Sequence, residues 1–242
     1  MKKPKMILFD YGQTLVDQAR FDGVKGSREV LKYAAANKYG VSAEELQEKA
    51  DELNRELGRF DPAKRHLNQI EVPNHMFTAY LYESLGITLS LTAEQIDKIF
   101  WDAAAPGTPT KGIEELLEFL YRSDIRTGVI SNISFCGKAV TDRINEVIPS
   151  NRFEFIIATS EYMYRKPNRR IFELALEKAG LKAEEVWYVG DQYECDIVGA
   201  GNAGLFPVRY LGAIDIAYEL KPDVMDIHSW AELKAYISEC TD

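Results

Sequence analysis

Residues 5–15 read Lys5-Met6-Ile7-Leu8-Phe9-Asp10-Tyr11-Gly12-Gln13-Thr14-Leu15. The apolar run that ends at Phe9 is typical of a strand buried on both faces, as in a parallel β-sheet. Open α/β sheets bind ligands beyond the carboxyl ends of their strands, so we expect Asp10 at the mouth of a site. Gly12 would let the main chain approach a ligand closely. An aspartate that only caps the following helix would give the same local pattern.

The composition is that of an ordinary globular protein. Of the 242 residues, 46% are hydrophobic and 28% are charged. This length suits one large domain or a domain that carries a smaller insertion. The net charge of -9 argues against nucleic acid or an acidic membrane surface as the main partner. A small anionic substrate stays compatible with it, because a metal or local cations can reverse the field inside a cleft.

The cysteines predict a reducing compartment. Cys136, Cys195 and Cys240 are far apart and include no CxxC pair. They are typical of reduced thiols in a cytoplasmic protein, and they imply no zinc site. The first residues show no apolar signal-peptide segment, and no stretch is apolar enough to predict a membrane span.

Residues 17–105 have helical patterns and almost no β-branched alternation, so we predict an all-helical insertion. Two capping boxes, Ser42 to Glu45 and Thr92 to Gln95, mark helix starts. The predicted helices are Ser27–Lys38, Ser42 to about Leu57, Val72–Leu85 and Ile96–Trp101. Asp61-Pro62 interrupts the pattern after the second helix, and Gly86 ends the third. Four antiparallel helices of this length suit a small bundle.

Beyond a linker at Pro106-Gly107-Thr108-Pro109, predicted strands alternate with predicted helices. The strands are Arg126–Ser131, Phe155–Ala158, Val186–Gly190 and Phe206–Tyr210; the helices are Gly112–Arg122, Lys138–Val147, Asn168–Ala179 and Asp196–Ala203. This alternation predicts βαβ units and a parallel sheet, to which the strand Met6–Phe9 also belongs. The expected fold is therefore α/β, a Rossmann-like core of residues 1–16 and 106–242 with residues 17–105 as an inserted helical domain.

Polar residues follow four of these strands and should meet at one edge of the sheet. They are Asp10, Ser131-Asn132, Arg165-Lys166-Pro167 and Gly190-Asp191. Asp10 and Asp191 would repel each other unless a cation lies between them, and Mg²⁺ held by carboxylates, water and phosphate is suited to that place. Lys166 and Ser131 could then bind phosphate oxygens. Singly, each residue has an ordinary structural role, as a cap, a surface charge or a turn former.

These four segments resemble the four motifs of the haloacid dehalogenase (HAD) superfamily, in the right order and across the whole chain. Residues 17–105 are similar to its helical C1 cap. The resemblance implies that Asp10 is a nucleophile that forms an aspartyl-phosphate. It implies Mg²⁺ on Asp10, on the carbonyl of Gly12 and on Asp191, with Asp196 supporting the metal shell. It also implies that Ser131, Asn132 and Lys166 bind phosphate, and that Lys166 screens the nucleophile.

Position 12 departs from that pattern. The family's phosphatases have a second aspartate here, which protonates the leaving oxygen and later activates water, a contribution of roughly 10²–10⁴-fold. Gly12 keeps the main-chain ligand but removes the acid/base, and a glycine can hold a positive φ in such a turn. The family's carbon–phosphorus hydrolases and dehalogenases also lack this aspartate. Dehalogenases usually have a tyrosine there, one residue after Tyr11, and the carbon–phosphorus enzymes use a cap lysine; Lys25, Lys38 and Lys49 are the candidates.

A glycine-rich segment and the three histidines do not indicate a function. Gly199 to Gly204 matches GxGxxG, but it closes a predicted helix rather than following a strand, so we interpret Gly204 as a helix C-cap and expect no dinucleotide. His66, His75 and His228 have no ligand spacing.

The leading hypothesis is a Mg²⁺-dependent HAD-type hydrolase that acts on a small phosphorylated metabolite. The alternatives are a HAD-fold regulatory protein with little or no turnover, and a HAD enzyme of carbon–phosphorus cleavage or phosphoryl transfer. Retention of Asp10, Lys166, Asp191 and Asp196 together favours an enzyme. The sequence predicts neither the substrate nor the oligomeric state.

Overall fold

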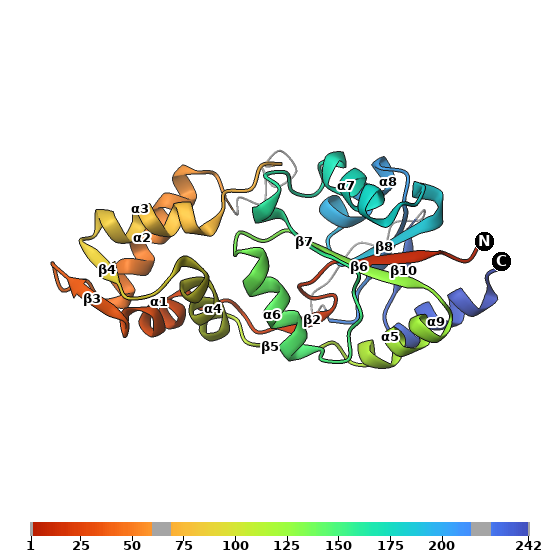
Figure 1. Ribbon diagram of the computed structural model, residues 1–242, viewed down its shortest axis with the longest axis horizontal. Helices are drawn as coiled ribbons and strands as arrows, with labels where there is room; N and C mark the ends of the chain where they lie inside the picture. The colour runs from red at the N-terminus through yellow and green to blue at the C-terminus, as the bar shows by residue number, and fades with distance from the viewer. Residues whose placement is uncertain (1, 60–68, 214–223, 242) are drawn as a thin grey trace.

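The computed structural model describes residues 2–59, 69–213 and 224–241 (Figure 1). Its centre is a parallel sheet of six strands in the order β10-β9-β8-β1-β6-β7. The strands are β1 (Met6–Phe9), β6 (Arg126–Ser131), β7 (Ile156–Ala158), β8 (Val186–Gly190), β9 (Phe206–Tyr210) and β10 (Met225–Ile227). The α/β class and the parallel sheet predicted from the sequence are confirmed.

The central strand β1 is fully buried and alternates between two hydrophobic cores. Ile7 and Phe9 pack with the helices α5 (Ile113–Arg122), α6 (Gly137–Val147) and α9 (Trp230–Glu239). Met6 and Leu8 face the other side, where α7 (Arg169–Ala179) and the short α8 (Gly199–Asn202) lie. The continuous apolar run of β1 is thus explained by burial on both faces of the sheet.

The chain order places the carboxyl end of β1 at a switch point. After β1, the chain passes to β6 and β7 on one side, and β8 then pairs with β1 from the other side. A crevice opens at such a position beyond the strand ends. Asp10 and Asp191, which follow β1 and β8, therefore lie at the same edge.

Between β1 and β6 the chain forms a mainly helical insert, at the left of Figure 1. It comprises α1 (Gly23–Leu31), α2 (Ala43–Glu56), α3 (Asn74–Ser84), α4 (Ala93–Ala104), β3 (Ala34–Asn37) and β4 (Ile87–Leu89). Its buried residues form a separate hydrophobic cluster. Both predicted capping boxes, at Ser42 and Thr92, are present.

One helix of the insert was predicted too long. The predicted helix Ser27–Lys38 begins earlier, at Gly23, and ends at Leu31. Residues Ala34–Asn37 instead pair with β4 in a two-stranded antiparallel ribbon, so the insert is not purely helical. Pairing with β4 outweighs the high intrinsic helix propensity of three consecutive alanines, which is a weak prior against tertiary context. Asp61-Pro62 and His66 lie outside the described residues.

The connections between insert and sheet are more ordered than a linker. Residues Gly107–Pro109 form β5, which pairs antiparallel with β2 (Val16–Gln18). A further contact joins residues 69–71 of the insert to the loop before Lys166, where the Arg165 amide donates to the Gln69 carbonyl at 3.0 Å. The predicted linker is therefore one strand of a ribbon.

Near the C-terminal end, two elements were missed and one helix differs. Neither β10 nor α9 was predicted. Helix α9 is capped by Ser229, and its first residue, Trp230, stacks on Tyr210 with ring centroids 4.0 Å apart. In place of a helix over Asp196–Ala203 there is a π-helical turn (Tyr193–Val198) followed by α8. Gly204 has a φ of 85°, as expected for the residue that ends a helix. In the described part of the chain, no helix could cross a membrane.

Candidate active site

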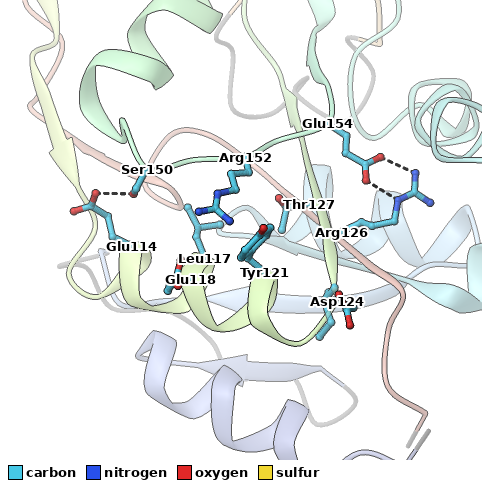
Figure 2. Close-up of a pocket in the computed structure, with 11 residues that line it drawn as sticks. Glu114, Leu117, Glu118, Tyr121, Asp124, Arg126, Thr127, Ser150, Arg152 and Glu154 are labelled. Atoms are coloured by element: carbon cyan, nitrogen blue, oxygen red, sulfur yellow. Dashed lines mark hydrogen bonds and ion pairs between the residues drawn. The ribbon is translucent and has the colours of Figure 1, made fainter.

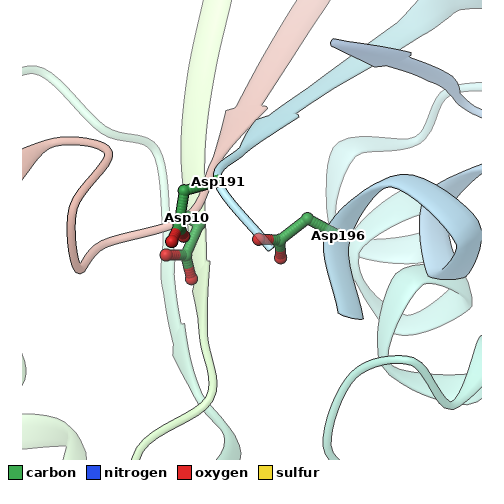
Figure 3. A group of neighbouring side chains, drawn as sticks. All are labelled: Asp10, Asp191 and Asp196. Carbon is green, nitrogen blue, oxygen red and sulfur yellow. The ribbon is translucent and has the colours of Figure 1, made fainter. Parts of the chain in front are cut away.

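Three carboxylates meet at the carboxyl edge of the sheet, as Figure 3 shows. Asp10 follows β1, Asp191 follows β8, and Asp196 lies in the π-helical turn. One carboxylate oxygen from each lies within 4.8 Å of the other two. The topology thus brings together the three aspartates that the sequence singled out.

The Lys166 ammonium is buried among these groups. Its Nζ lies 2.6 Å from Asp10 Oδ1 and 2.7 Å from Asp196 Oδ1. Only 1% of the side chain is exposed, so Lys166 is not a surface charge. Its charge is instead held against the two carboxylates.

Tyr188 completes this network, and the sequence analysis missed it. Its hydroxyl accepts from Lys166 Nζ at 2.6 Å and lies 3.2 Å from Asp196 Oδ1 and from the Ile130 carbonyl oxygen. In the sequence Tyr188 lies inside an apolar strand and has the pattern of a core residue. Its phenol is the polar end of an otherwise buried side chain.

Gly190 allows Asp196 to reach the site. A Cβ on Gly190 would lie 2.4 Å from the Asp196 carboxylate carbon, which leaves no room for any other residue. Asp196 Oδ2 in turn accepts from the Gln192 amide at 2.9 Å. Asp196 therefore orients both Lys166 and the turn that carries Asp191.

Asn132 holds the loop of Lys166 in place. Its Nδ2 donates to the Lys166 carbonyl oxygen and its Oδ1 accepts from the Lys166 amide, both at 2.8 Å. Ser131, the last residue of β6, is buried beside it. These contacts make Asn132 a positioning residue, and phosphate binding by Ser131 and Asn132 stays a prediction.

The charges in the site are unbalanced without a cation. Burial raises the pKa of Asp10 to about 6. The Lys166 charge opposes this shift, and the Asp196 charge adds to it. Burial and the charges of Asp10 and Asp196 also raise the pKa of Asp191 well above its usual value. For Lys166, burial acts to lower the pKa, but the charges of Asp10 and Asp196 raise it above its usual value.

A divalent cation fits this arrangement. Asp191 Oδ1 is buried and has no hydrogen-bond partner among the described residues. Such an oxygen is costly unless a ligand engages it. All the side-chain atoms that could bind the metal here are carboxylate oxygens, which are ligands that suit Mg²⁺. Gly12 has no side chain, so position 12 can offer only main-chain atoms as ligands.

The turn at Gly12 differs from the expected one. Gly12 does not have a positive φ; the left-handed residue is Gln13, at 54°. A Cβ on Gly12 would lie 2.9 Å from Gln18 Oε1 and close to no other side-chain group besides that carboxamide. The Tyr11 hydroxyl accepts from Arg143 Nε at 2.8 Å, and its ring packs on Trp101, so Tyr11 does not take the position of the missing aspartate.

The other candidate residues from the sequence, which are lysines, histidines and glycines, do not belong to the carboxylate cluster. Lys25 and Lys38 are exposed, and the hydrogen bond to Glu52 raises the pKa of Lys49, so none of the three is a desolvated lysine. His75 and His228 are exposed. Gly199 packs on Phe172 and on the Pro167 main chain, a structural role for the GxGxxG segment.

A separate cavity of about 300 Å³ lies near the opposite end of β6, where Figure 2 shows its lining. Two of its charged residues pair with each other, and a third lies against an aromatic ring. Arg126 makes two hydrogen bonds of 2.6 Å to Glu154, and the Arg152 guanidinium stacks 3.5 Å from the centre of the Tyr121 ring. The cavity does not include any of the carboxylates around Lys166.

Comparison with known proteins identifies similar sequences. Residues 7–209 match the model of the haloacid dehalogenase-like hydrolase family. Over 201 residues the chain is 29% identical to the pyrimidine 5'-nucleotidase YjjG of Escherichia coli, covering 82% of each chain. It is 26% identical over 210 residues to the glyceraldehyde 3-phosphate phosphatase of Pyrococcus abyssi, covering 85% of this chain and 81% of that one.

Solved structures with the same fold extend over almost the whole chain. A 2-haloacid dehalogenase from Pseudomonas syringae has a TM-score of 0.67 at 22% identity, covering 98% of this chain and 99% of that one. The magnesium-bound putative HAD-hydrolase YfnB of Bacillus subtilis has a TM-score of 0.55 at 16% identity, with the same coverage. At these identities the likeness establishes the fold.

Proposed function

Because the chain belongs to the haloacid dehalogenase-like hydrolase family, we propose that it is a Mg²⁺-dependent phosphatase that transfers phosphate from a small metabolite to Asp10. The observation that carries this proposal is the cluster at the switch point, three carboxylates around one buried ammonium. Its relatives include a pyrimidine nucleotidase and a glyceraldehyde 3-phosphate phosphatase, and both names describe small phosphorylated substrates.

In the proposed reaction, an Asp10 oxygen attacks phosphorus and the substrate oxygen leaves. Lys166, 2.6 Å from Asp10, balances the carboxylate charge and keeps Asp10 ionised for attack. Ser131 and the same lysine would bind the phosphate oxygens. Asp10, Asp191 and the carbonyl of Gly12 would hold Mg²⁺, which when bound neutralises charge on the phosphoryl group. Asp196 keeps Lys166 oriented through its 2.7 Å contact.

The insert is proposed to serve as a C1-type cap. In this proposal, residues 17–105 form a domain that closes over the site and excludes water, joined to the sheet domain of residues 1–16 and 106–242. Its separate hydrophobic cluster and its two-stranded connection support the division. The wide spacing of the three cysteines along the chain is the pattern from which we infer a cytoplasmic location.

The alternatives are less well supported. A carbon–phosphorus hydrolase needs a desolvated lysine, and the described lysines 25, 38 and 49 of the insert are not buried. A regulatory protein without turnover is favoured only by Gly12. The Asp10–Lys166–Asp196 contacts favour catalysis, because binding alone does not need a nucleophile paired with a buried ammonium.

A panel of phosphate esters tests the function. We expect the purified protein to release phosphate with Mg²⁺ and to lose this activity in EDTA, and Asp10→Asn to be inactive under both conditions. Phosphate release by Asp10→Asn at the wild-type rate would refute the proposed nucleophile. Mg²⁺-dependent binding of phosphate without release from any ester would favour the regulatory alternative.

A further inference from the structure

We propose that Gln18 positions the water that hydrolyses the aspartyl-phosphate on Asp10, and that its carboxamide stands where a side chain at position 12 would otherwise lie. This inference rests on the proposed function, because it concerns the second half of the same reaction. The observation behind it is that Gln18 Oε1 lies 2.9 Å from the point where a Cβ on Gly12 would be. The space that a side chain at position 12 would enter therefore contains a carboxamide from strand β2.

The main chain of Gln18 is held in place. Gln18 is the last residue of β2 and pairs with Gly107 of β5. Its carbonyl oxygen accepts from Gln13 Nε2 at 3.0 Å, which ties the strand to the turn after Asp10. The turn and the ribbon together therefore fix the Cα of Gln18 beside Gly12, and the carboxamide reaches position 12 from there.

The carboxamide itself is available to bind water. Its side chain is half-buried, and among the described residues no protein group hydrogen-bonds it. Tyr11 is engaged with Arg143, and both ends of the Asn132 carboxamide are engaged with Lys166. In the turn itself, Gln13 Oε1 and Thr14 Oγ1 are buried and have no hydrogen-bond partner among the described residues. Gln18 differs from these groups in its position, because its Oε1 is the atom nearest to the point where a Cβ on Gly12 would lie.

The chemistry of the second step suits a carboxamide. The water oxygen forms a bond to phosphorus while the bond between phosphorus and the Asp10 oxygen breaks. Asp10 leaves as a carboxylate, and both water protons end on the product as dihydrogen phosphate. No base is required, so a carboxamide that accepts a hydrogen bond can orient the water, as the glutamine of GTPases does. A carboxamide cannot protonate the leaving oxygen in the first step, which restricts efficient substrates to those with good leaving groups.

Rapid-quench kinetics with an aryl phosphate and Mg²⁺ separates the two steps. In Gln18→Ala we expect the decay of the phosphoenzyme to slow by about tenfold, the effect of one hydrogen bond, with its formation almost unchanged. In Gln18→Glu, a carboxylate of the same length should restore decay and give it a rise with pH that follows carboxylate ionisation. Asp17→Asn, an exposed neighbour on the same strand, serves as the matched control and should behave as wild type.

Three results would overturn the assignment. Equal decay in wild type and Gln18→Ala would refute the role of Gln18 while leaving the proposed function intact. Decay in Gln18→Glu that is slow and independent of pH would refute it even if Gln18→Ala failed to fold. Absence of any phosphoenzyme and of any phosphate release in wild type would refute the proposed function and the role of Gln18 with it.

Discussion

At the scale of single residues, the property that decides the chemistry of the site is its excess of carboxylates over the one ammonium of Lys166. Asp10 and Asp196 share its ammonium, whereas Asp191 Oδ1 has no partner among the described groups. A divalent cation would match the negative charge that remains. Asp191 is thus the residue whose removal affects the cation most directly.

Asp191→Asn should weaken Mg²⁺ binding strongly and leave the fold intact, because it removes one charge and one oxygen ligand. Isothermal titration of Mg²⁺ measures the effect, and Asp142→Asn, which disrupts a pair with Lys138 on α6, is the control. If Asp191 were only a turn residue, both variants would bind Mg²⁺ as wild type does.

Gly12→Asp should restore part of the missing acid/base catalysis. The turnover of alkyl phosphates should rise by part of the roughly 10²–10⁴-fold factor that such a group contributes. The turnover of aryl or acyl phosphates should change little. The backbone does not oppose the change, since Gly12 lacks a positive φ and the new Cβ would meet only the movable end of Gln18. If the variant folds, binds Mg²⁺ and gains nothing on alkyl phosphates, position 12 is not the site of a missing acid.

The raised pKa of Asp10 predicts how stability depends on pH in the metal-free protein. The folded state holds the Asp10 proton up to about pH 6, whereas the unfolded state releases it near the ordinary value of 3.8. Between these values the folded state binds more protons, so the free energy of unfolding should fall as pH rises. For Asp10 the fall is at most about 3 kcal/mol, from two pH units at 1.36 kcal/mol each.

Urea unfolding in EDTA at several pH values between 4 and 7 measures this fall. Asp10→Asn should reduce the slope, and Mg²⁺ should stabilise the wild-type protein most at the upper end of the range, since it binds the ionised carboxylates. An identical slope in wild type and Asp10→Asn would contradict the prediction.

At the scale of elements, prediction succeeded where a local pattern determines the structure. The strands Arg126–Ser131, Val186–Gly190 and Phe206–Tyr210 have the predicted bounds, and both capping boxes form. It failed where a distant segment decides. Residues 34–37 and 107–109 are strands because partners far along the chain pair with them, and their own sequences carry no period-2 pattern.

Helix α6 shows how the insert supports an element beside the sheet. Cys136, its N-cap residue, provides no side-chain cap, and the Cys136 amide donates instead to Asp97 Oδ2 of α4 at 2.7 Å. The other carboxylate oxygen of Asp97 accepts from Asn74 Nδ2 at 2.6 Å. This buried carboxylate therefore joins two helices of the insert to the start of α6.

Asp97→Ala should lower the free energy of unfolding by about 1–3 kcal/mol, because it leaves two part-buried donors without their acceptor. Amide exchange in the first turn of α6 should also become faster. Glu146→Ala, which removes the exposed pair with Lys98, is the control and should cost no more than about 1 kcal/mol. Equal stability of the two variants would show that the Asp97 contacts do not hold the insert to α6.

At the scale of the whole molecule, the candidate site combines residues that differ in how visible they are in the sequence. Asp10, Lys166 and Asp191 each lie at a strand end or in the loop after one, where the topology predicts convergence. Tyr188 could not be recognised, because only the packing of α7 and the π-helical turn directs its hydroxyl to Lys166. Gln18 lies beside Gly12 because the turn after Asp10 folds β2 back, with Gln13 Nε2 bonded to the Gln18 carbonyl oxygen, and because β2 pairs with β5.

In the proposed reaction, phosphate passes through a covalent bond to Asp10. The most direct measurement is acid quenching of the Mg²⁺-loaded protein during turnover of an aryl phosphate, followed by peptide mass spectrometry. We predict a phosphoryl group on the peptide that contains Asp10, formed before phosphate release, absent in EDTA and absent from Asp10→Asn. Steady release of phosphate with no phosphorylated Asp10 at any time point, or with the group on another residue, would contradict the account.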